Sequence, residues 1–493
     1  MKKRLALILF GLLIVALSAP AYAQFEWKVS GYFDTNVFWY NNAYKTDQIY
    51  GNYKDTNSRS VPDTGSLDKT GHYFNTRGRF KFDAVMGKEV SATMFFEMDS
   101  TKWGETAGGA NQSGRWQADQ TDVEVKNLFL DFAIPYVGIP VPMTARIGIQ
   151  PLVARPEFAV NTDGAGITLG FKLDPVTISP YFAKASHNKD YANDDSDVWG
   201  INTITRIGKL AFGAWGVFYN MHTYPLNGLN TVSAAVDPSY TAKMYWFGGY
   251  ADGKVGPLDM KADFIYDTGR VEGFGSQPTA RDVDYRGWLA RLNLALPIEM
   301  FEFGVKALYA TGADQKDTGG RGLPGEATPW GGTSKRVASF VSPPGTEVAS
   351  YGVNGPGIFF DNMLLGRGVT FGGSNANAMT RGAVGGIWHV TAYGSYKVTP
   401  WYKVTPMVMY IGDTTENGNT IGTARSNRGN PRDDHDIGWE LGLYNEIQIY
   451  KNLSWGTSFA YLIAGDALDW YGTGGNIQMS NPWLIGSIVK YTW

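Results

Sequence analysis

The chain has 493 residues, with 61 Gly, 16 Trp, 28 Tyr, 26 Phe and no Cys. Its mean hydropathy is −0.22, with 14% aromatic and 18% charged residues, which excludes both a bundle of membrane-spanning helices and a disordered polar chain. The absence of Cys excludes disulfides, thiolate metal sites and covalent haem attachment. The net charge of −3 provides no electrostatic basis for binding nucleic acid.

Residues 1–23 are predicted to be a secretory signal peptide. The basic residues Lys2–Arg4 precede an apolar run over 5–18, and the small-residue pattern Ala21-Tyr22-Ala23 follows. The apolar run is shorter than the roughly 20 residues that a membrane-spanning helix needs. Cleavage before Gln24 removes three positive charges, so the net charge becomes −6 instead of −3. Residues 24–493 are then expected to form one exported domain.

Apolar and polar residues alternate along most of the chain, beginning at Phe25. Phe25, Trp27 and Val29 fall on one face, with Glu26 and Lys28 on the other. A period of two residues is typical of a strand with one apolar face. About eighteen strands are predicted in this way, near 25–41, 72–86, 90–103, 121–133, 142–150, 165–173, 176–185, 197–207, 210–220, 240–251, 257–267, 283–296, 301–311, 383–396, 401–412, 436–450, 453–464 and 482–493.

The connections between the predicted strands alternate between short and long. Short ones include 87–89, 174–175 and 451–452, whereas 42–71 and 312–382 are long. The periplasmic turns and extracellular loops of an up-and-down barrel produce this alternation, and a Greek-key sandwich has no reason to show it. The predicted fold class is therefore all-β, a transmembrane antiparallel up-and-down β-barrel of about 18 strands.

Aromatic residues gather at the ends of the predicted strands, where two interfacial girdles of a membrane barrel belong. The predicted outer girdle includes Trp39, Tyr40, Trp103 and Tyr219. The predicted inner girdle includes Trp27, Tyr396, Trp401, Tyr402, Tyr450 and Tyr491. This placement favours a barrel over a sandwich, which would have its aromatic residues in the middle of the strands.

The last strand carries a resemblance to a known class. Residues 483–493 end in an aromatic residue, Trp493, with Val489 and Tyr491 on the same face, and look like the terminal assembly signal of bacterial outer-membrane barrels. They depart from that pattern by ending in Trp rather than Phe and by carrying Ser487 on the apolar face. With its predicted strands, the whole mature chain resembles Gram-negative outer-membrane porins.

A more distant resemblance is to the alginate-export and carboxylate-selective porin families. The segment 125–132, followed by 145–150, looks like a strand pair common in those families. The resemblance implies an integral protein of the Gram-negative outer membrane. It names no substrate.

We expect a channel for the passive diffusion of small hydrophilic solutes, because a wide barrel without a plug domain leaves an aqueous path. A preference for anions or for saccharides is left open. The alternatives are a polysaccharide export channel of the alginate-export kind and a barrel that sheathes a partner protein. The expected contacts are outer-membrane lipid, lipopolysaccharide and small solutes, and a homotrimer is an open alternative.

Catalysis and metal binding have little support in the sequence. There is no G-x-S-x-G motif, and His389, one of five histidines, lies within a predicted strand without a serine motif beside it. The oxygen-rich stretches 193–197 and 433–436 lack the spacing of a recognised cation loop. We therefore expect no enzyme activity, no cofactor and no metal.

Inward-facing charged side chains are the candidate residues for lining the pore and selecting the solute. They are Arg77, Arg79, Lys81, Glu97, Arg146, Arg155, Asp263, Arg291 and Lys306. A three-residue turn at 87–89 would put Arg79 opposite Glu97 and Arg77 opposite Asp99, as cross-strand ion pairs. Across the turn at 297–300, Arg291 is expected opposite Lys306. Such like charges would need a loop carboxylate, a passing anion or screening by water.

Two long loops are candidate constrictions of the pore. The stretch 151–164 contains Arg155, Glu157 and Asp163 and occupies the place of the third long loop, which folds into the lumen in many porins. The stretch 312–382 contains an apolar run at 358–360, which is unusual for a solvated loop. Two interpretations of this stretch remain: it folds into the lumen, or it forms a mobile flap on the surface.

Overall fold

The computed structural model describes residues 25–41, 70–104, 123–135, 138, 140–155, 158–186, 195–222, 224–225, 236–237, 240–273, 280–320, 322–346, 384–472 and 475–493. The predicted signal peptide, the apolar run at 358–360 and Glu157 lie outside these residues. No helix of the described chain is long and apolar enough to cross a membrane.

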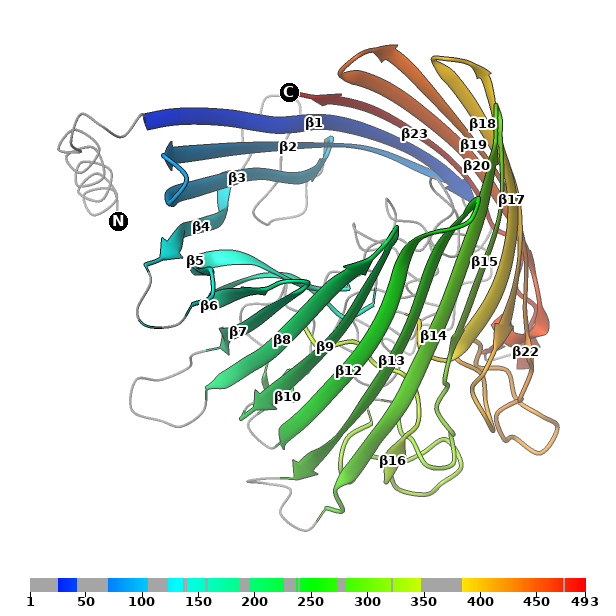
Figure 1. Ribbon diagram of the computed structural model, residues 1–493. Helices are drawn as coiled ribbons and strands as arrows, with labels where there is room; N and C mark the ends of the chain where they lie inside the picture. Colours follow the sequence, from blue (N-terminus) through cyan, green and yellow to red (C-terminus); the bar gives the residue numbers. More distant parts are fainter. Residues whose placement is uncertain are drawn as a thin grey trace.

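Eighteen antiparallel strands form one closed barrel, which confirms the predicted fold class (Figure 1). The wall consists, in order, of β1 (Phe25–Asn41), β2 (Thr70–Met86), β3 (Val90–Lys102), β4 (Val123–Ile134), β5 (Met143–Ala154), β6 (Val160–Leu173), β7 (Val176–Ser186), β8 (Ser196–Ile207), β9 (Leu210–Met221), β12 (Tyr240–Val255), β13 (Leu258–Gly273), β14 (Val283–Ile298), β15 (Phe301–Ala310), β17 (Ile387–Thr399), β18 (Tyr402–Asp413), β19 (Asp436–Tyr450), β20 (Leu453–Ala464) and β23 (Trp483–Thr492). The first and last strands close the ring, with Tyr32 opposite Thr492 and Asn41 opposite Trp483.

The short elements lie outside this wall. They are β10 (Tyr224–Pro225) with β11 (Val236–Asp237), β21 (Trp470–Gly472) with β22 (Gly475–Ile477), β16 (Arg336–Val337) and the 3-10 turn η2 (Asp466–Leu468). Of these, β16 pairs in parallel with the start of β14.

The alternation seen in the sequence separates an outer apolar face from an inner face. On β12, Met244 and Trp246 are fully buried, whereas Tyr245 and Phe247 are 37% and 51% exposed. Inward residues are covered by other parts of the chain, and outward ones are left for lipid. An apolar exposed face on a closed barrel is what a membrane-spanning wall requires.

Most of the predicted girdle side chains that the structure describes face outward. Trp27, Trp103, Trp401 and Tyr450 are all more than half exposed. Tyr219 is a correction: it is 9% exposed and points inward, because it alternates with the outward Phe218 on β9. The outer girdle at this strand is formed instead by Phe218, whose ring stacks on Tyr245 at 4.7 Å.

The apolar core lies inside the barrel, against β12–β14. Trp246 donates a hydrogen bond from Nε1 to the carbonyl of Val341 at 2.7 Å, and the Tyr285 hydroxyl donates to the Gly322 carbonyl at 3.0 Å. Phe340 and Val341 are fully buried there. The described part of the long loop, 312–320 and 322–346, is therefore packed inward, whereas its apolar run at 358–360 remains untested.

The prediction that the other candidate constriction, 151–164, is a long loop is wrong. Strands β5 and β6 continue to Ala154 and from Val160, so that only residues 155–159 connect them. The strands extend because Pro151 to Ala154 pair with Asp163 to Val160 across the hairpin. This short connection still reaches into the barrel, since Phe158 and Ala159 are fully buried.

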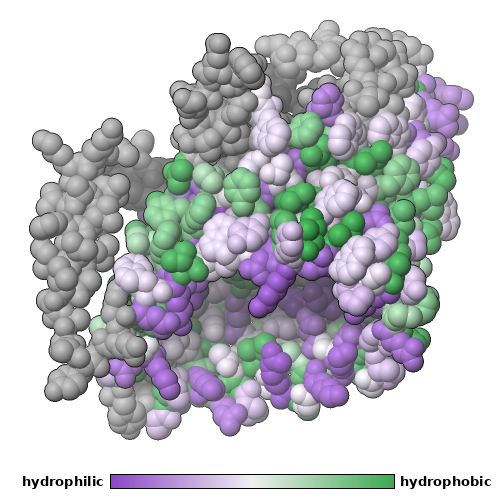
Figure 2. Space-filling view, turned by 90° about the horizontal axis from the view of Figure 1, so that it is seen from above, coloured by the Kyte–Doolittle hydropathy of each residue, from purple (hydrophilic) through white to green (hydrophobic). Residues whose placement is uncertain are grey.

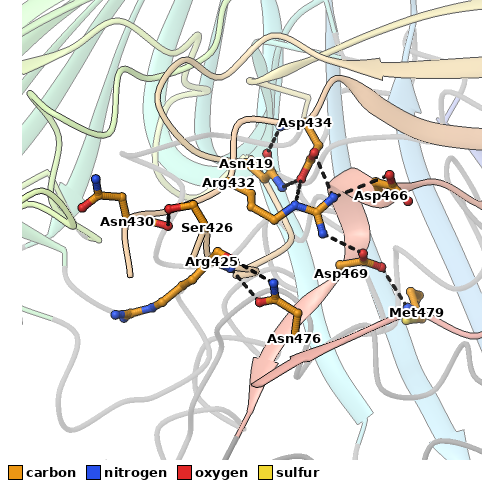
Figure 3. Close-up of polar contacts among 10 residues, drawn as sticks. All are labelled: Asn419, Arg425, Ser426, Asn430, Arg432, Asp434, Asp466, Asp469, Asn476 and Met479. Carbon is orange, nitrogen blue, oxygen red and sulfur yellow. Dashed lines mark hydrogen bonds and ion pairs between the residues drawn. The ribbon is translucent and has the colours of Figure 1, made fainter. Parts of the chain in front are cut away.

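Two loops beyond β18 and β20 are joined by Arg432, as Figure 3 shows. Its guanidinium lies 2.9 Å from Asp434, 3.1 Å from Asp469 and 3.5 Å from Asp466. Burial raises the pKa of the Asp469 carboxyl above its ordinary value, although Arg432 and the Met479 N–H oppose this shift. The loops form one fixed unit at the outer end of the barrel.

Candidate functional site

The first charged cluster lies on the inner wall of β2–β4 and centres on Glu97. This carboxylate, 3% exposed, lies 3.0 Å from Arg77, 2.8 Å from Arg79 and 3.2 Å from Lys126. The predicted pairing of Arg79 with Glu97 is present in the register. The β2–β3 ladder shifts between Thr76 and Gly78, so Arg77 has no directly opposed residue in the register, and its predicted ion pair with Asp99 stays a prediction. Glu97 therefore faces three cations, of which Lys126 also lies 2.7 Å from Asp163.

A cavity of about 360 Å³ opens beside this cluster along β2–β6. Arg79, Lys81, Lys126 and Arg146 line it, together with the rings of Phe95 and Phe129 and the polar side chains of Asn127, Asn161, Thr162 and Asp163. The lining thus has four cations and one carboxylate. Such a cavity offers charge, hydrogen-bond donors and flat apolar surfaces to a small solute.

Arg146 is held in place by two contacts from neighbouring positions. Its Nε and Nη2 donate to the two carboxylate oxygens of Asp131 at 2.8 and 2.9 Å, in the bidentate arrangement that fixes a guanidinium. Its guanidinium also lies 4.4 Å from the centre of the Phe129 ring. Both side chains of the Arg146–Asp131 pair are about one-third exposed to the lumen.

The second charged cluster centres on Asp263, whose side chain has no exposed surface. Arg155 donates from Nε at 2.5 Å and Arg291 donates from Nε at 2.6 Å. Arg291 faces Asp263 across the β13–β14 ladder, whereas Arg155 comes from the 155–159 turn, five strands further round the wall. A buried carboxylate between two guanidiniums satisfies its own lone pairs. Arg155 also lies 3.7 Å from Asp252, so the cluster holds two guanidiniums and two carboxylates.

Aromatic rings support both arginines of this cluster. The Arg155 guanidinium lies 4.1 Å from the centre of the Tyr250 ring, and Arg291 lies 4.6 Å from the centre of the Phe158 ring. The Tyr250 ring lies flat against β9 because residue 213 is Gly: a Cβ there would meet the ring at 2.2 Å. The Ser342 hydroxyl donates to the Phe158 carbonyl at 2.9 Å, which joins the turn to the inward loop.

Lys306 belongs to neither cluster, and its predicted partner is wrong. Arg291 lies opposite Leu308, and Lys306 lies opposite Asn293. The turn is Glu299-Met300, one residue later than its expected centre, and Glu299 adopts a positive φ of 51° there. The register is therefore shifted by two residues, and the expected clash of like charges does not arise. Lys306 lies 5.7 Å from the centre of the Tyr393 ring.

Three residues of these clusters were not predicted from the sequence: Lys126, Phe158 and Tyr250. Strict alternation on β4 places Lys126 with the lipid-facing residues, but Lys126 is the extra residue of a β4 bulge between Val125 and Asn127, opposite Phe96 and Phe95, and this bulge brings it inward. The signal that could have revealed it is the charge itself, since an outward Lys at that depth would be costly in lipid.

Among the described residues, no group of three or more His, Asp and Glu side chains has the arrangement to hold a metal ion. His389 is buried on β17, where its Nδ1 lies 3.1 Å from the Thr391 hydroxyl. His389 is therefore a buried residue of the barrel wall.

No family model and no curated protein matches this chain. Among solved structures, the chain is similar to Pseudomonas aeruginosa OccK8 (OprE), at 10% identity over 95% of this chain and 98% of that chain, with a TM-score of 0.49. It is also similar to Pseudomonas aeruginosa OpdQ, at 10% identity over the same shares, with a TM-score of 0.49. The chain is similar as well to Pseudomonas aeruginosa OpdL, at 11% identity over 94% of this chain and 99% of that chain, with a TM-score of 0.45. Similarity at this level assigns neither a family nor a solute to this chain.

Proposed function

We propose that the protein is a porin of the Gram-negative outer membrane, through which small hydrophilic solutes diffuse passively with a preference for anions. The wall supports this proposal, because it has an apolar outer face and a charged inner face. The observation that carries the proposal is the cavity along β2–β6, with its four cations and one carboxylate.

The preference for anions follows from the balance of charge on the β2–β6 side. The first cluster and the cavity beside it hold five cations, Arg77, Arg79, Lys81, Lys126 and Arg146, and the four carboxylates that pair with them, Asp83, Glu97, Asp131 and Asp163, which is an excess of one cation. Walls of low dielectric concentrate the field of such an excess in the aqueous space between them. Anions therefore enter more readily than cations of the same size.

The path past the clusters is set by what fills the rest of the lumen. The 155–159 turn and the described part of 312–346 cover the inner wall at β12–β14, so that the residues the structure describes leave the β2–β6 side for solutes. Figure 2 shows hydrophilic side chains around the hollow in the face that is seen from above. A solute on this side would pass Arg79, Lys81 and Arg146.

The same packing argues against a sheath around a partner protein. A sheath needs an empty lumen, whereas this chain places its own Phe158, Phe340 and Val341 inside the barrel. A polysaccharide exporter would need a wide continuous passage, which the inward segments narrow. The diffusion channel remains the function that the geometry supports best.

The test is the reversal potential of single channels in a planar bilayer under a KCl gradient. We expect anion selectivity, and we expect Lys81→Gln with Arg146→Gln to reduce it by roughly thirtyfold, since each of the two unit charges within about 4 Å in water is worth about 1 kcal/mol, a factor of about five. The matched control, Lys209→Gln with Lys451→Gln, removes two cations from periplasmic turns and should leave selectivity unchanged. Cation selectivity of the wild type would refute the proposed preference.

A further inference from the structure

The loop between β18 and β19 contains a tight hairpin turn at residues 425–430. The Gly429 N–H donates to the Ser426 carbonyl at 2.8 Å, and the Ser426 N–H donates to the Asn430 carbonyl, also at 2.8 Å. Ser at the first position and Gly at the fourth, here with a φ of 82°, are typical of a type I turn that closes with a glycine bulge. Arg428, at the third position, therefore lies at the apex of the turn.

The neighbouring loop, between β20 and β23, holds this turn in place. The side chain of Asn476 accepts the Arg425 N–H at 2.8 Å and donates to the Arg425 carbonyl at 2.7 Å, as a neighbouring strand would. At the base of the hairpin, the Arg432 N–H donates to the Ala424 carbonyl at 2.8 Å, and the Arg432 guanidinium binds the three carboxylates that join the two loops (Figure 3). The turn therefore has a fixed shape without any partner.

The turn carries positive charge and has no carboxylate of its own. Residues 418–432 and 470–482 contain three arginines and no Asp or Glu. Arg432 is occupied by the carboxylates at the base of the loops, whereas Arg425 and Arg428 form no ion pair in the part of the chain that the structure describes. Figure 3 shows the Arg425 side chain pointing away from those carboxylates. The negative charge of the two loops thus lies at their base, and the positive charge lies at the turn.

The turn presents these arginines beside an aromatic ring and small polar groups. Arg425 and Arg428 are exposed, and so are Ser426 and Asn427 between them. Tyr471 is 48% exposed, and the centre of its ring lies 4.9 Å from the Arg425 guanidinium. Residues 425–430 and Tyr471 are called here the basic tip. Tyr and Arg anchors among Ser, Gly and Asn are the composition of loops that recognise protein surfaces.

We propose that the basic tip binds an extracellular protein that presents carboxylate side chains at its surface. The planar guanidiniums of Arg425 and Arg428 match the oxygens of carboxylates. A projecting turn cannot enclose a small solute, which needs a concave site, and no residue of the tip lines the cavity along β2–β6. A protein is favoured over a polysaccharide because of the anchor residues and the fixed shape of the turn, which lowers the entropy cost of association. The site is independent of conduction.

The experiment measures the binding of fluorescein-labelled poly-L-glutamate to the purified barrel in detergent, by fluorescence anisotropy. The wild type should bind it, and Arg425→Gln with Arg428→Gln should weaken binding by roughly tenfold, since each exposed charge pair contributes a factor of about three. The matched control Lys209→Gln with Lys451→Gln removes the same charge at the opposite end and should bind as the wild type does. Gly429→Val keeps both arginines but strains the turn at its positive φ, so it should also weaken binding, which attraction by charge alone would not produce.

Three results would overturn the proposal: unchanged affinity of the double arginine variant, unchanged affinity of Gly429→Val, or an equal loss in the lysine control. Labelled polyglucuronate should bind the wild type more weakly than poly-L-glutamate does, and tighter binding of it would show a polysaccharide site instead. If a variant fails to fold, as judged by unheated gel migration, the comparison of the two polymers on the wild type still decides.

Discussion

At the scale of single residues, the Asp263 cluster shows how a charge is kept inside a membrane barrel. Its carboxylate is fully buried, and the two guanidiniums that meet it come from positions 108 and 28 residues away in the sequence. The alternation of side chains could predict that Asp263 and Arg291 face inward, and the place of Arg155 between two predicted strands made it a candidate for the lumen. It could not predict that they meet, because that depends on how far the 155–159 turn reaches across the lumen.

Replacing Asp263 by Asn should destabilise the barrel strongly. The change leaves two guanidiniums buried around a neutral group, and breaking a buried ion pair in this way costs about 3–5 kcal/mol. The free energy of unfolding in urea, measured in lipid vesicles, should fall by that amount. Asp259→Asn is the control on the same strand, because its pair with Lys254 is 45% exposed and should contribute less than about 1 kcal/mol. Equal losses in the two variants would contradict this account.

Gly213→Ala should displace the Tyr250 ring and with it the support of Arg155. The added Cβ would lie 2.2 Å from the ring carbons, which is closer than atoms can approach. We expect a loss of about 1–3 kcal/mol, which is typical of overpacking, and partial recovery when Tyr250 is also changed to Ala. Gly249→Ala provides the comparison, since its nearest neighbour would be 3.8 Å away. The midpoint of urea unfolding is measured for Gly213→Ala and for Gly249→Ala. Similar midpoints would show that the Tyr250 ring does not require a glycine at residue 213.

At the scale of elements, the predicted strands were close to those of the structure, but their registers were less predictable. The β2–β3 hairpin follows from its short turn, so Arg79 and Glu97 could be paired from the sequence. The β14–β15 register differs by two residues because a shorter turn, Glu299-Met300, is centred one residue later. A bulge on β4 likewise reverses the face of Lys126. Turn centres and bulges depend on local backbone geometry, which alternation does not encode.

The inward position of the long loop is testable by a disulfide, because the chain has no Cys of its own. Val337 of β16 pairs with Tyr285 of β14 in the structure, and both side chains are fully buried. The variant Tyr285→Cys with Val337→Cys should therefore cross-link on mild oxidation, which a shift in gel migration under non-reducing conditions would reveal. The variant Tyr285→Cys with Lys451→Cys, at opposite ends of the barrel, should not cross-link. Failure of the first pair to close would place the loop elsewhere.

At the scale of the whole molecule, the fold could be predicted because two independent patterns agree. Alternation defines the strands, and the succession of short and long connections places neighbouring strands antiparallel. The filling of the lumen could not be predicted in the same way, since a Gly-rich segment such as 312–346 has no periodicity. The homotrimer remains a prediction, which the mass of the purified protein in detergent would test.

The central claim is that the barrel holds an open path for small solutes along β2–β6. The most direct measurement is the single-channel current of the purified wild-type protein in a planar bilayer of neutral lipid. The account predicts stepwise, lasting openings without any partner or added energy source, and a reversal potential on the anion side in a salt gradient. A protein that inserts as a folded barrel and passes no current would contradict it.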